Sequence, residues 1–153
     1  MNHLQLKKIA ARARLQFSQA VGEKQAYLCF MRLCTMIFAE RDAVEEIIKA
    51  DIKLRSALFK EKCSQLAEKY GGIFSLYGEL TVPQQLLAIC GTAAELLALP
   101  SEIFSGNGEV IGWCHQYYNE PYRNEIAVGL KSSKRLSSER IAAATQIFTP
   151  EWI

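Results

Sequence analysis

Residues 25–40, QAYLCFMRLCTMIFAE, carry the pattern that decides the fold class. Large apolar side chains recur there every three or four residues, at Tyr27, Phe30, Met31, Cys34, Ile37 and Phe38. This spacing gathers them on one face of an α-helix, because a helix turns once every 3.6 residues. Methionine and aromatic side chains at helical spacing are far more often core than ligand site. We therefore expect a helix over residues 25–40 with its stripe in the core.

The segments on both sides repeat this spacing. Residues 3–21 form a predicted helix that Gly22 ends, and its apolar stripe consists of Leu6, Ile9, Ala13, Phe17 and Ala20. After residue 40, Asp42 is expected to cap a third, longer helix that ends at Gly71-Gly72. The inner side of that helix is expected to carry Val44, Ile47, Ile48, Leu54, Leu58 and Leu66.

Further along the chain, residues 73–80 fit either one helical turn or an extended connector. Residues 81–99 open with Thr-Val-Pro and are apolar nearly all round, which favours a helix in a central, buried position. Pro100 ends this predicted helix, because proline cannot continue the helical hydrogen bonding. A turn over residues 101–104 and a loop over residues 105–108 follow.

The last third of the chain begins with a predicted helix over residues 109–119. One face of it carries Val110, Trp113, Cys114, Tyr117 and Tyr118. Pro121 is expected to interrupt this helix. A brief helix over residues 125–130, a polar loop and a short helix over residues 141–144 follow, the last capped by Ser137 or Ser138.

No segment shows the alternating pattern of a β-strand. We therefore predict an all-α protein, an irregular multi-helix bundle of about six to eight helices with an extended C-terminal segment. Residues 1–105 are predicted to form a helical N-terminal domain. Residues 106–153 are predicted to form an aromatic and basic helical segment that packs with it as one unit.

The composition is that of a globular chain, since 50% of the residues are hydrophobic and only 22% are charged. The cysteines are odd in number and form no C-x-x-C pair: Cys29, Cys34, Cys63, Cys90 and Cys114. We interpret them as reduced and structural, and we expect no metal site. No stretch approaches the roughly 20 apolar residues of a membrane span, and the N-terminus lacks the apolar core of a signal peptide. We therefore expect a cytoplasmic protein without membrane contact.

The residues alone name no reaction, because the chain lacks phosphate-binding, dinucleotide-binding, zinc-protease and hydrolase-nucleophile motifs. Cys114 and His115 are adjacent, and adjacent helical side chains point about 100° apart, so they are not expected to pair as nucleophile and base. Basic residues gather at both ends of the chain. Those near the start are Lys7, Lys8, Arg12 and Arg14. Phosphate contacts and solvated helix faces both remain open as interpretations.

The last third also resembles a known family. The order IGWCHQYYNE (residues 111–120), EIAVGLK (125–131), SSKR (132–135) and ERIAAATQIFTPEWI (139–153) is similar to large bacterial adenine-specific DNA methyltransferases. These are the enzymes of phage-exclusion (BREX, PglX-like) and type II restriction–modification systems. The match is dense over this stretch and looser at the N-terminal helix. Ala142 departs from it, since the family often has proline there.

In the family, this stretch comes just before the fold that binds S-adenosylmethionine. The resemblance therefore implies an N-terminal helical region that supports a catalytic domain, with duplex DNA, the rest of the enzyme and other defence-system proteins as partners. The glycine turn for the cofactor and the [NDS]-P-P-[YF] motif for the flipped adenine do not occur, so the 153 residues are expected to be inactive alone. We also expect that the chain ends just where a new helix begins. In the family, the methyltransferase fold follows, and the 153 residues do not contain it. A free-standing helical interaction or regulatory module derived from such an enzyme is the alternative.

The resemblance also implies site residues. Phe148, Thr149 and Pro150 match the segment that closes over the methionine part of the cofactor, and a helix N-terminus favours its carboxylate. The alternative is that the Thr-Pro pair only caps a helix. Aromatic and basic residues together suit stacking on bases and holding phosphates, and the candidates for DNA contact are Tyr122, Arg123, Lys131, Lys134 and Arg135. Trp113 and Tyr117 are interpreted as packing residues.

Overall fold

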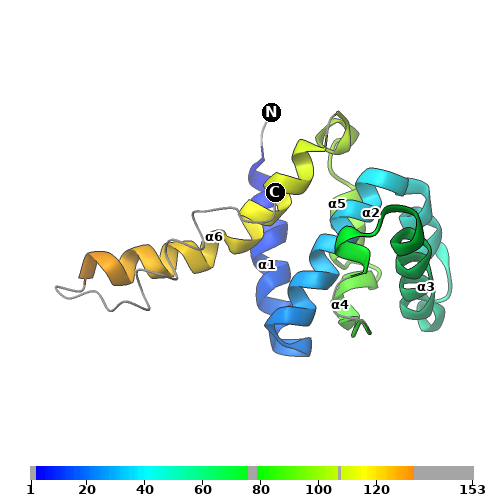
Figure 1. Ribbon diagram of the computed structural model, residues 1–153, viewed down its shortest axis with the longest axis horizontal. Helices are drawn as coiled ribbons and strands as arrows, with labels where there is room; N and C mark the ends of the chain where they lie inside the picture. The colour runs from blue at the N-terminus through cyan, green and yellow to red at the C-terminus, as the bar shows by residue number, and fades with distance from the viewer. Residues whose placement is uncertain (1–2, 76–78, 107, 133–153) are drawn as a thin grey trace. The chain divides into compact units, whose positions relative to one another are not determined.

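The computed structural model describes residues 3–75, 79–106 and 108–132, with side chains as far as residue 120. Six α-helices and two 3-10 turns occur in that part of the chain, and it contains no strand, so the all-α prediction is confirmed (Figure 1). The elements are α1 (Leu4–Val21), α2 (Glu23–Lys49), α3 (Ile52–Tyr70), η1 (Gly72–Phe74), α4 (Gln84–Leu87), α5 (Thr92–Leu97), η2 (Ser101–Phe104) and α6 (Glu109–Ser132).

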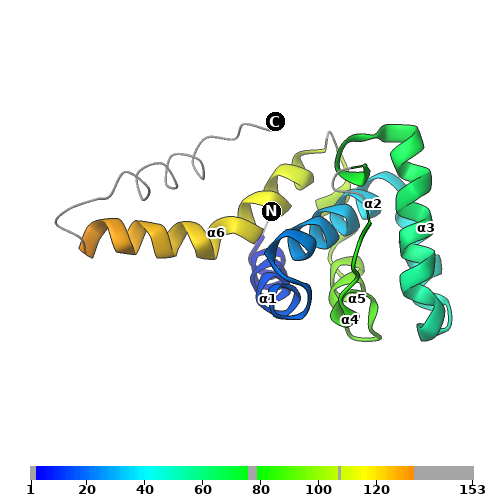
Figure 2. The same cartoon turned by 60° about the horizontal axis from the view of Figure 1, so that its bottom comes forward.

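The chain divides into two compact units, residues 1–118 and residues 119–153, and α6 begins in the first and continues into the second. The first unit is built around α2. Seven consecutive α2 residues, Leu28–Cys34, are buried, so this helix is enclosed on every side. Figures 1 and 2 show it between α1 and α3, and α4 and α5 also pack against it. The predicted core stripe of residues 25–40 is confirmed. The central, buried position predicted for residues 81–99 is borne out in part, since α4 and α5 pack against α1 and α2 but Ile89 between them is 74% exposed.

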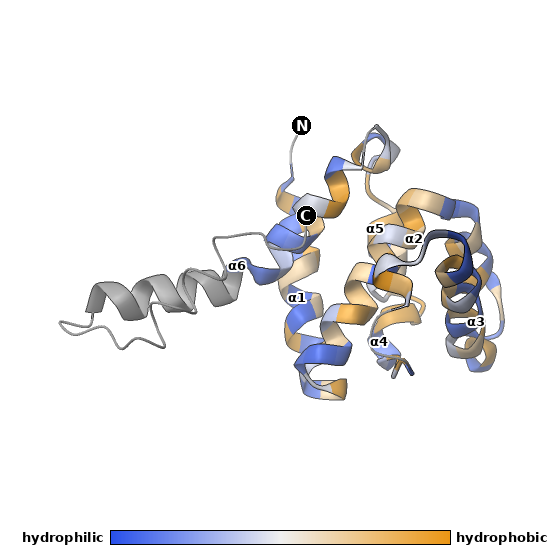
Figure 3. Ribbon diagram, in the orientation of Figure 1, coloured by the Kyte–Doolittle hydropathy of each residue, from blue (hydrophilic) through white to orange (hydrophobic). Residues whose placement is uncertain are grey.

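The first helix pair follows the sequence prediction. α1 buries Leu6, Ile9, Ala13 and Phe17 of its predicted stripe, whereas Ala20 is exposed. Figure 3 shows the result as alternating hydrophilic and hydrophobic stretches along the α1 ribbon. Gly22 ends the helix with φ +85°, a backbone conformation that side-chain-bearing residues rarely adopt, and its N–H donates to Ser18 at 3.0 Å.

The boundary between the second and third helices lies later than predicted. Glu40 does leave helical geometry, with φ −147° and ψ 69°, but α2 resumes and continues to Lys49. The cap of α3 is Asp51, whose Oδ1 accepts from the Lys53 N–H at 3.0 Å, so the assignment of Asp42 as the cap was wrong. The new boundary changes which residues face inward, and Leu54 is 56% exposed rather than buried.

Residues 81–99 form two short helices instead of one long helix. The backbone leaves helical geometry at Ala88, with ψ 163°, and Gly91 is extended, with ψ −171°. In a continuous helix the Gly91 N–H would donate to the Leu87 carbonyl. Instead Arg55 Nη1 donates to that carbonyl at 2.7 Å, and the Gly91 N–H donates to Ala88 at 2.9 Å. The chain is so close here that a Cβ on Gly91 would lie 2.3 Å from the Gln85 carbonyl oxygen.

Arg55 belongs to a group of three arginines that donate to the carbonyls of helix ends. Its Nε also donates to Ala50, the C-terminal cap of α2, at 3.0 Å. Arg41 Nη2 donates to Leu97, the last residue of α5, at 2.6 Å. Arg32 Nε donates to Ile73 of η1 at 2.9 Å. Carbonyls at helix ends lack a partner within the helix and carry partial negative charge, so a guanidinium is a well-matched donor.

The remaining predictions concern the turns before α6, the effect of Pro121 and the end of the chain. The turn η2 and the loop around Ser105 lie where predicted, and η1 supplies the single helical turn considered for residues 73–80. Pro121 does not end the helix, since α6 runs through it to Ser132, so the predicted interruption was wrong. The short helix expected over residues 141–144, with its serine cap, lies outside the described residues. Within the described part, no helix is both long and apolar enough to span a membrane.

Replacing Arg55 with methionine keeps most of the side-chain length but removes its hydrogen bonds to the buried Leu87 carbonyl and the half-buried Ala50 carbonyl. A carbonyl left without a donor costs about 1–3 kcal/mol, so we expect Arg55→Met to lower the free energy of unfolding by about 2–4 kcal/mol. Urea unfolding followed by circular dichroism measures this. Lys53→Met, at an exposed position in the same helical turn, should change it by less than about 0.5 kcal/mol. Equal stability of the two variants would show that the Arg55 contacts are unimportant.

Candidate functional site

The structure reaches only part of the predicted site. Phe148, Thr149 and Pro150, the predicted cofactor residues, lie outside the described residues, as do Lys134 and Arg135. Tyr122, Arg123 and Lys131 lie on α6, where the backbone is described and the side chains are not. The predicted cofactor and DNA contacts therefore remain predictions.

The aromatic side chains at the start of α6 pack inside the first unit. Tyr118 is buried and stacks on Phe30 of α2 with 5.0 Å between ring centroids. Tyr117 is also buried, and its hydroxyl hydrogen-bonds His3 Nδ1 at 2.6 Å. The Trp113 ring lies 4.3 Å from the His3 ring. Packing is thus the role that the structure shows for these aromatics.

Most of the basic residues of α1 contact other parts of the first unit. Lys7 Nζ lies over the Tyr117 ring, 5.2 Å from its centroid, and Arg14 Nη1 donates to the Tyr118 carbonyl at 3.3 Å. Arg12 pairs with Glu95 of α5 at 2.7 Å, although half of its side chain is exposed. Lys8 is exposed and has no hydrogen bond or ion pair in the described part of the chain. Lys7, Arg12 and Arg14 therefore fix α1 to α5 and α6, although Lys7, Lys8 and Arg12 are also exposed to solvent.

Cys114 and His115 face different partners, as the helical geometry predicts. Cys114 is fully buried and lies against Cys34 of α2, within hydrogen-bonding reach of its thiol. The His115 ring makes an edge contact with Tyr27, and its Nδ1 lies 3.1 Å from the Tyr27 hydroxyl. The two neighbours therefore do not act on one another as nucleophile and base.

The cysteines are all free thiols, and four of the five are buried. Burial raises the pKa of Cys29 to about 12 and that of Cys63 to about 11, the latter partly offset by the positive charge of Arg32. Burial also raises the pKa of Cys34 well above its ordinary value. A thiol must ionise to react, so these groups are structural. Cys90 alone is exposed.

A cavity of 310 Å³ lies beside Arg32, which sequence reasoning had counted only as part of the core helix. Its lining comes from α2, α3, η1 and the connection after η1: Arg32, Lys60, Cys63, Ser64, Ala67, Phe74, Glu79 and Leu80. Arg32 is 3% exposed and donates to the Ile73 carbonyl. A charged residue inside an apolar run is the signal that could have drawn attention to it.

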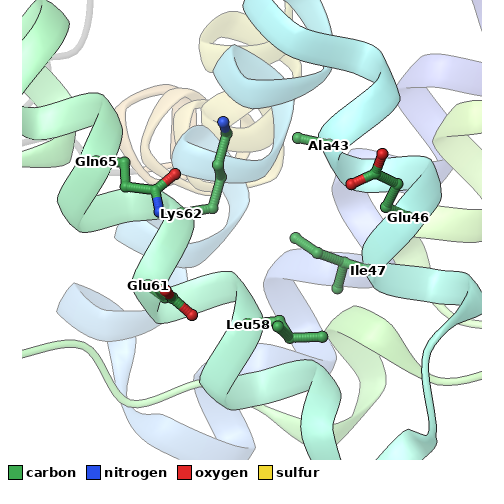
Figure 4. Close-up of a pocket in the computed structure, with 7 residues that line it drawn as sticks. All are labelled: Ala43, Glu46, Ile47, Leu58, Glu61, Lys62 and Gln65. Atoms are coloured by element: carbon green, nitrogen blue, oxygen red, sulfur yellow. The ribbon is translucent and has the colours of Figure 1, made fainter.

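A second hollow, of 270 Å³, lies between the later part of α2 and the middle of α3 (Figure 4). We call it the α2–α3 groove, and it is lined by Ala43, Glu46, Ile47, Leu58, Glu61, Lys62 and Gln65. Ile47 and Leu58 extend into the space between the two helices in Figure 4. Lys62 pairs with Glu40 at 3.1 Å, whereas Glu46 and Glu61 form no ion pair within the described residues. The groove therefore has two apolar side chains between its helices, and its polar lining combines the two acids with Lys62 and Gln65.

The described residues contain no candidate metal-binding cluster. Among the residues that the structure describes, no group of three or more histidine, cysteine, aspartate or glutamate side chains is arranged to hold a metal ion. The first unit thus includes one hollow beside a buried arginine and another whose lining carries two acids and a lysine.

Comparison with known proteins finds two curated relatives, both named as adenine-specific methyltransferases. The chain is 28% identical to BrxX of Escherichia coli O9:H4 (strain HS) over an alignment of 191 residues that covers 95% of this chain. It is 48% identical to PglX of Lacticaseibacillus casei (strain Zhang) over 48 residues, or 31% of this chain. The homology is weak in the first case and short in the second. No family model matches the chain, and no solved structure matches it significantly.

The relatives are much longer than the matched region. The chain spans 15% of the length of BrxX and 4% of the length of PglX. The likeness therefore concerns a small part of each relative.

The thiols give a direct test of the described packing. At pH 8 a thiol of pKa 11 is only about 0.1% ionised, and burial slows it further, so we expect one fast reaction with a disulfide reagent, at Cys90. Cys90→Ser should remove that reaction, and in 8 M urea without reductant all five thiols of the original chain should react. Absorbance of the released thiolate counts them. A second fast thiol in the folded protein would contradict the burial described here.

Proposed function

We propose that this chain is the helical region of an adenine-specific, S-adenosylmethionine-dependent DNA methyltransferase of a phage-defence or restriction–modification system. The observation that carries the proposal is the alignment with BrxX, which extends over 95% of the chain. The 48% identity to PglX over a shorter stretch supports the same class of enzyme. The bacterial cytoplasm is the proposed location, since DNA and reduced thiols are found there.

The role proposed for the region is support of the catalytic domain, and not catalysis. The 153 residues lack the [NDS]-P-P-[YF] motif with which such enzymes hold a flipped adenine. The first unit is a closely packed body in which α2 is enclosed by its neighbours. A body of this kind is suited to hold an adjoining segment in a fixed position, as a catalytic site requires.

The cofactor and DNA contacts are proposed for the end of the chain. Phe148, Thr149 and Pro150 are proposed to form one wall of the cofactor site in the complete enzyme. For DNA, the cations of α1 are poor candidates because most of them contact the protein's own aromatic and acidic side chains. The proposed DNA-binding residues are therefore those of the second unit, Tyr122, Arg123, Lys131, Lys134 and Arg135.

Methyl transfer tests the assignment. The protein is expressed both as the 153-residue chain and with any reading frame that continues past codon 153, then incubated with labelled S-adenosylmethionine and mixed-sequence duplex DNA. We expect the longer protein to methylate adenine and the 153-residue chain to methylate nothing. Transfer by the shorter chain would contradict the supporting role. No adenine methylation by the longer protein would contradict the function itself, and a stop codon directly after residue 153 would favour the regulatory module.

Thr149→Val tests the cofactor site in the same longer protein, because it keeps the side-chain shape and removes the hydroxyl. A hydrogen bond to a charged carboxylate contributes about 1.5–3 kcal/mol, so S-adenosylmethionine affinity should fall roughly 10- to 150-fold. Isothermal titration calorimetry measures it, with DNA affinity as the control that should not change. Unaltered cofactor affinity would leave Thr149 as a helix cap only.

A further inference from the structure

Two surfaces of the first unit are open and complement one another in charge. One is the α2–α3 groove. The other is a line of exposed residues along α1, which we call the α1 stripe: Leu4, Lys8, Ala11 and Leu15. The groove carries two apolar side chains and two acids that form no ion pair among the described residues, while the lysine on its lining, Lys62, is held by Glu40. The stripe has apolar ends and a central cation.

The groove continues along α3 beyond the hollow itself. Leu54 lies one helical turn before Leu58, on the same face, and is 56% exposed. Leu54, Leu58, Glu61 and Gln65 thus form a line at intervals of four, three and four residues. Glu61 stands near the middle of this line, and Glu46 faces the hollow from α2. The two acids form no ion pair within the described residues, so their charge is available to a cation from outside.

The α1 stripe has the same geometry. Its residues are also spaced by four, three and four, which keeps them on one face over about three turns, or roughly 16 Å. Leu4 is 49% exposed and Leu15 is 62% exposed, while five other residues of the same helix are buried. Lys8 lies between them and, unlike the other α1 cations, forms no hydrogen bond, ion pair or ring contact within the described part.

We propose that the α1 stripe of one copy of this chain docks in the α2–α3 groove of a second copy, with Lys8 placed against Glu61 and Glu46. The apolar ends of the stripe would cover Leu54 and Leu58. α1 and α3 lie on opposite sides of α2 in Figures 1 and 2, so one molecule cannot close this contact on itself. The contact is head-to-tail, and copies therefore add in a row or a ring. Both faces are small, so the dissociation constant is on the order of 10–100 µM.

Sedimentation velocity of the 153-residue chain, from about 1 to 500 µM in 50 mM salt, tests the proposal. The sedimentation coefficient should rise with concentration, and 500 mM salt should suppress the rise. Glu61→Lys and Lys8→Glu each place like charges together and should each give monomers throughout the range. Glu102→Lys makes the same charge change at an exposed site on η2 and should behave as the unaltered chain. Urea unfolding checks that all three variants are folded.

Mixing the two monomeric variants gives the decisive result. Each variant keeps one native face, and the two altered faces are again opposite in charge. An equimolar mixture of the Glu61→Lys and Lys8→Glu chains should therefore associate, although neither does alone. The proposal is overturned if the unaltered chain stays monomeric at all concentrations, if either substitution leaves association unchanged, or if the mixture remains monomeric.

Discussion

Hydrogen bonds from arginine side chains to the ends of helices hold the first unit in its particular form. A helix end in the interior leaves carbonyl oxygens without donors, and each one is costly to bury. Arg55 donates to the ends of both α2 and α4, while Arg41 donates to the end of α5. A guanidinium presents several donors in a fixed plane, so one side chain can serve two chain segments. The hydrophobic core supplies most of the driving force, but these bonds determine where the short helices stop.

The sequence predicted the helical class, the first helix, the turn at Gly22 and the turn over residues 101–104 because local spacing and helix-stopping residues determine them. It failed where a distant side chain decides the outcome. Nothing near Leu87 indicates that its carbonyl will be taken by Arg55, 32 residues earlier, so residues 81–99 looked like one helix. Asp42 and Asp51 are both reasonable caps by residue type, and only the packing of α3 distinguishes them.

The candidate site shows the same division between local and long-range information. The packing of Trp113 and Tyr117 could be anticipated from their helical spacing. The contacts of the α1 cations could not be anticipated, because Arg12 pairs with a glutamate 83 residues away, on α5. The family resemblance came from the order of motifs in the last third, and the relatives named as adenine-specific methyltransferases support it. The residues on which the cofactor and DNA proposals rest lie beyond the described side chains.

The shortness of α4 and α5 imposes an order on folding. Helices of four and six residues are far below the length at which an isolated helix persists in water. They are poor early nuclei, because the carbonyls of their last residues, Leu87 and Leu97, accept hydrogen bonds from side chains of α3 and α2 that must first be brought into place. The long α1–α2 hairpin, whose contacts are local and whose turn is a single glycine, is the part able to form first. Residues 84–97 then behave as late-folding structure, and they should be the first part of the unit to open when the region is strained or heated.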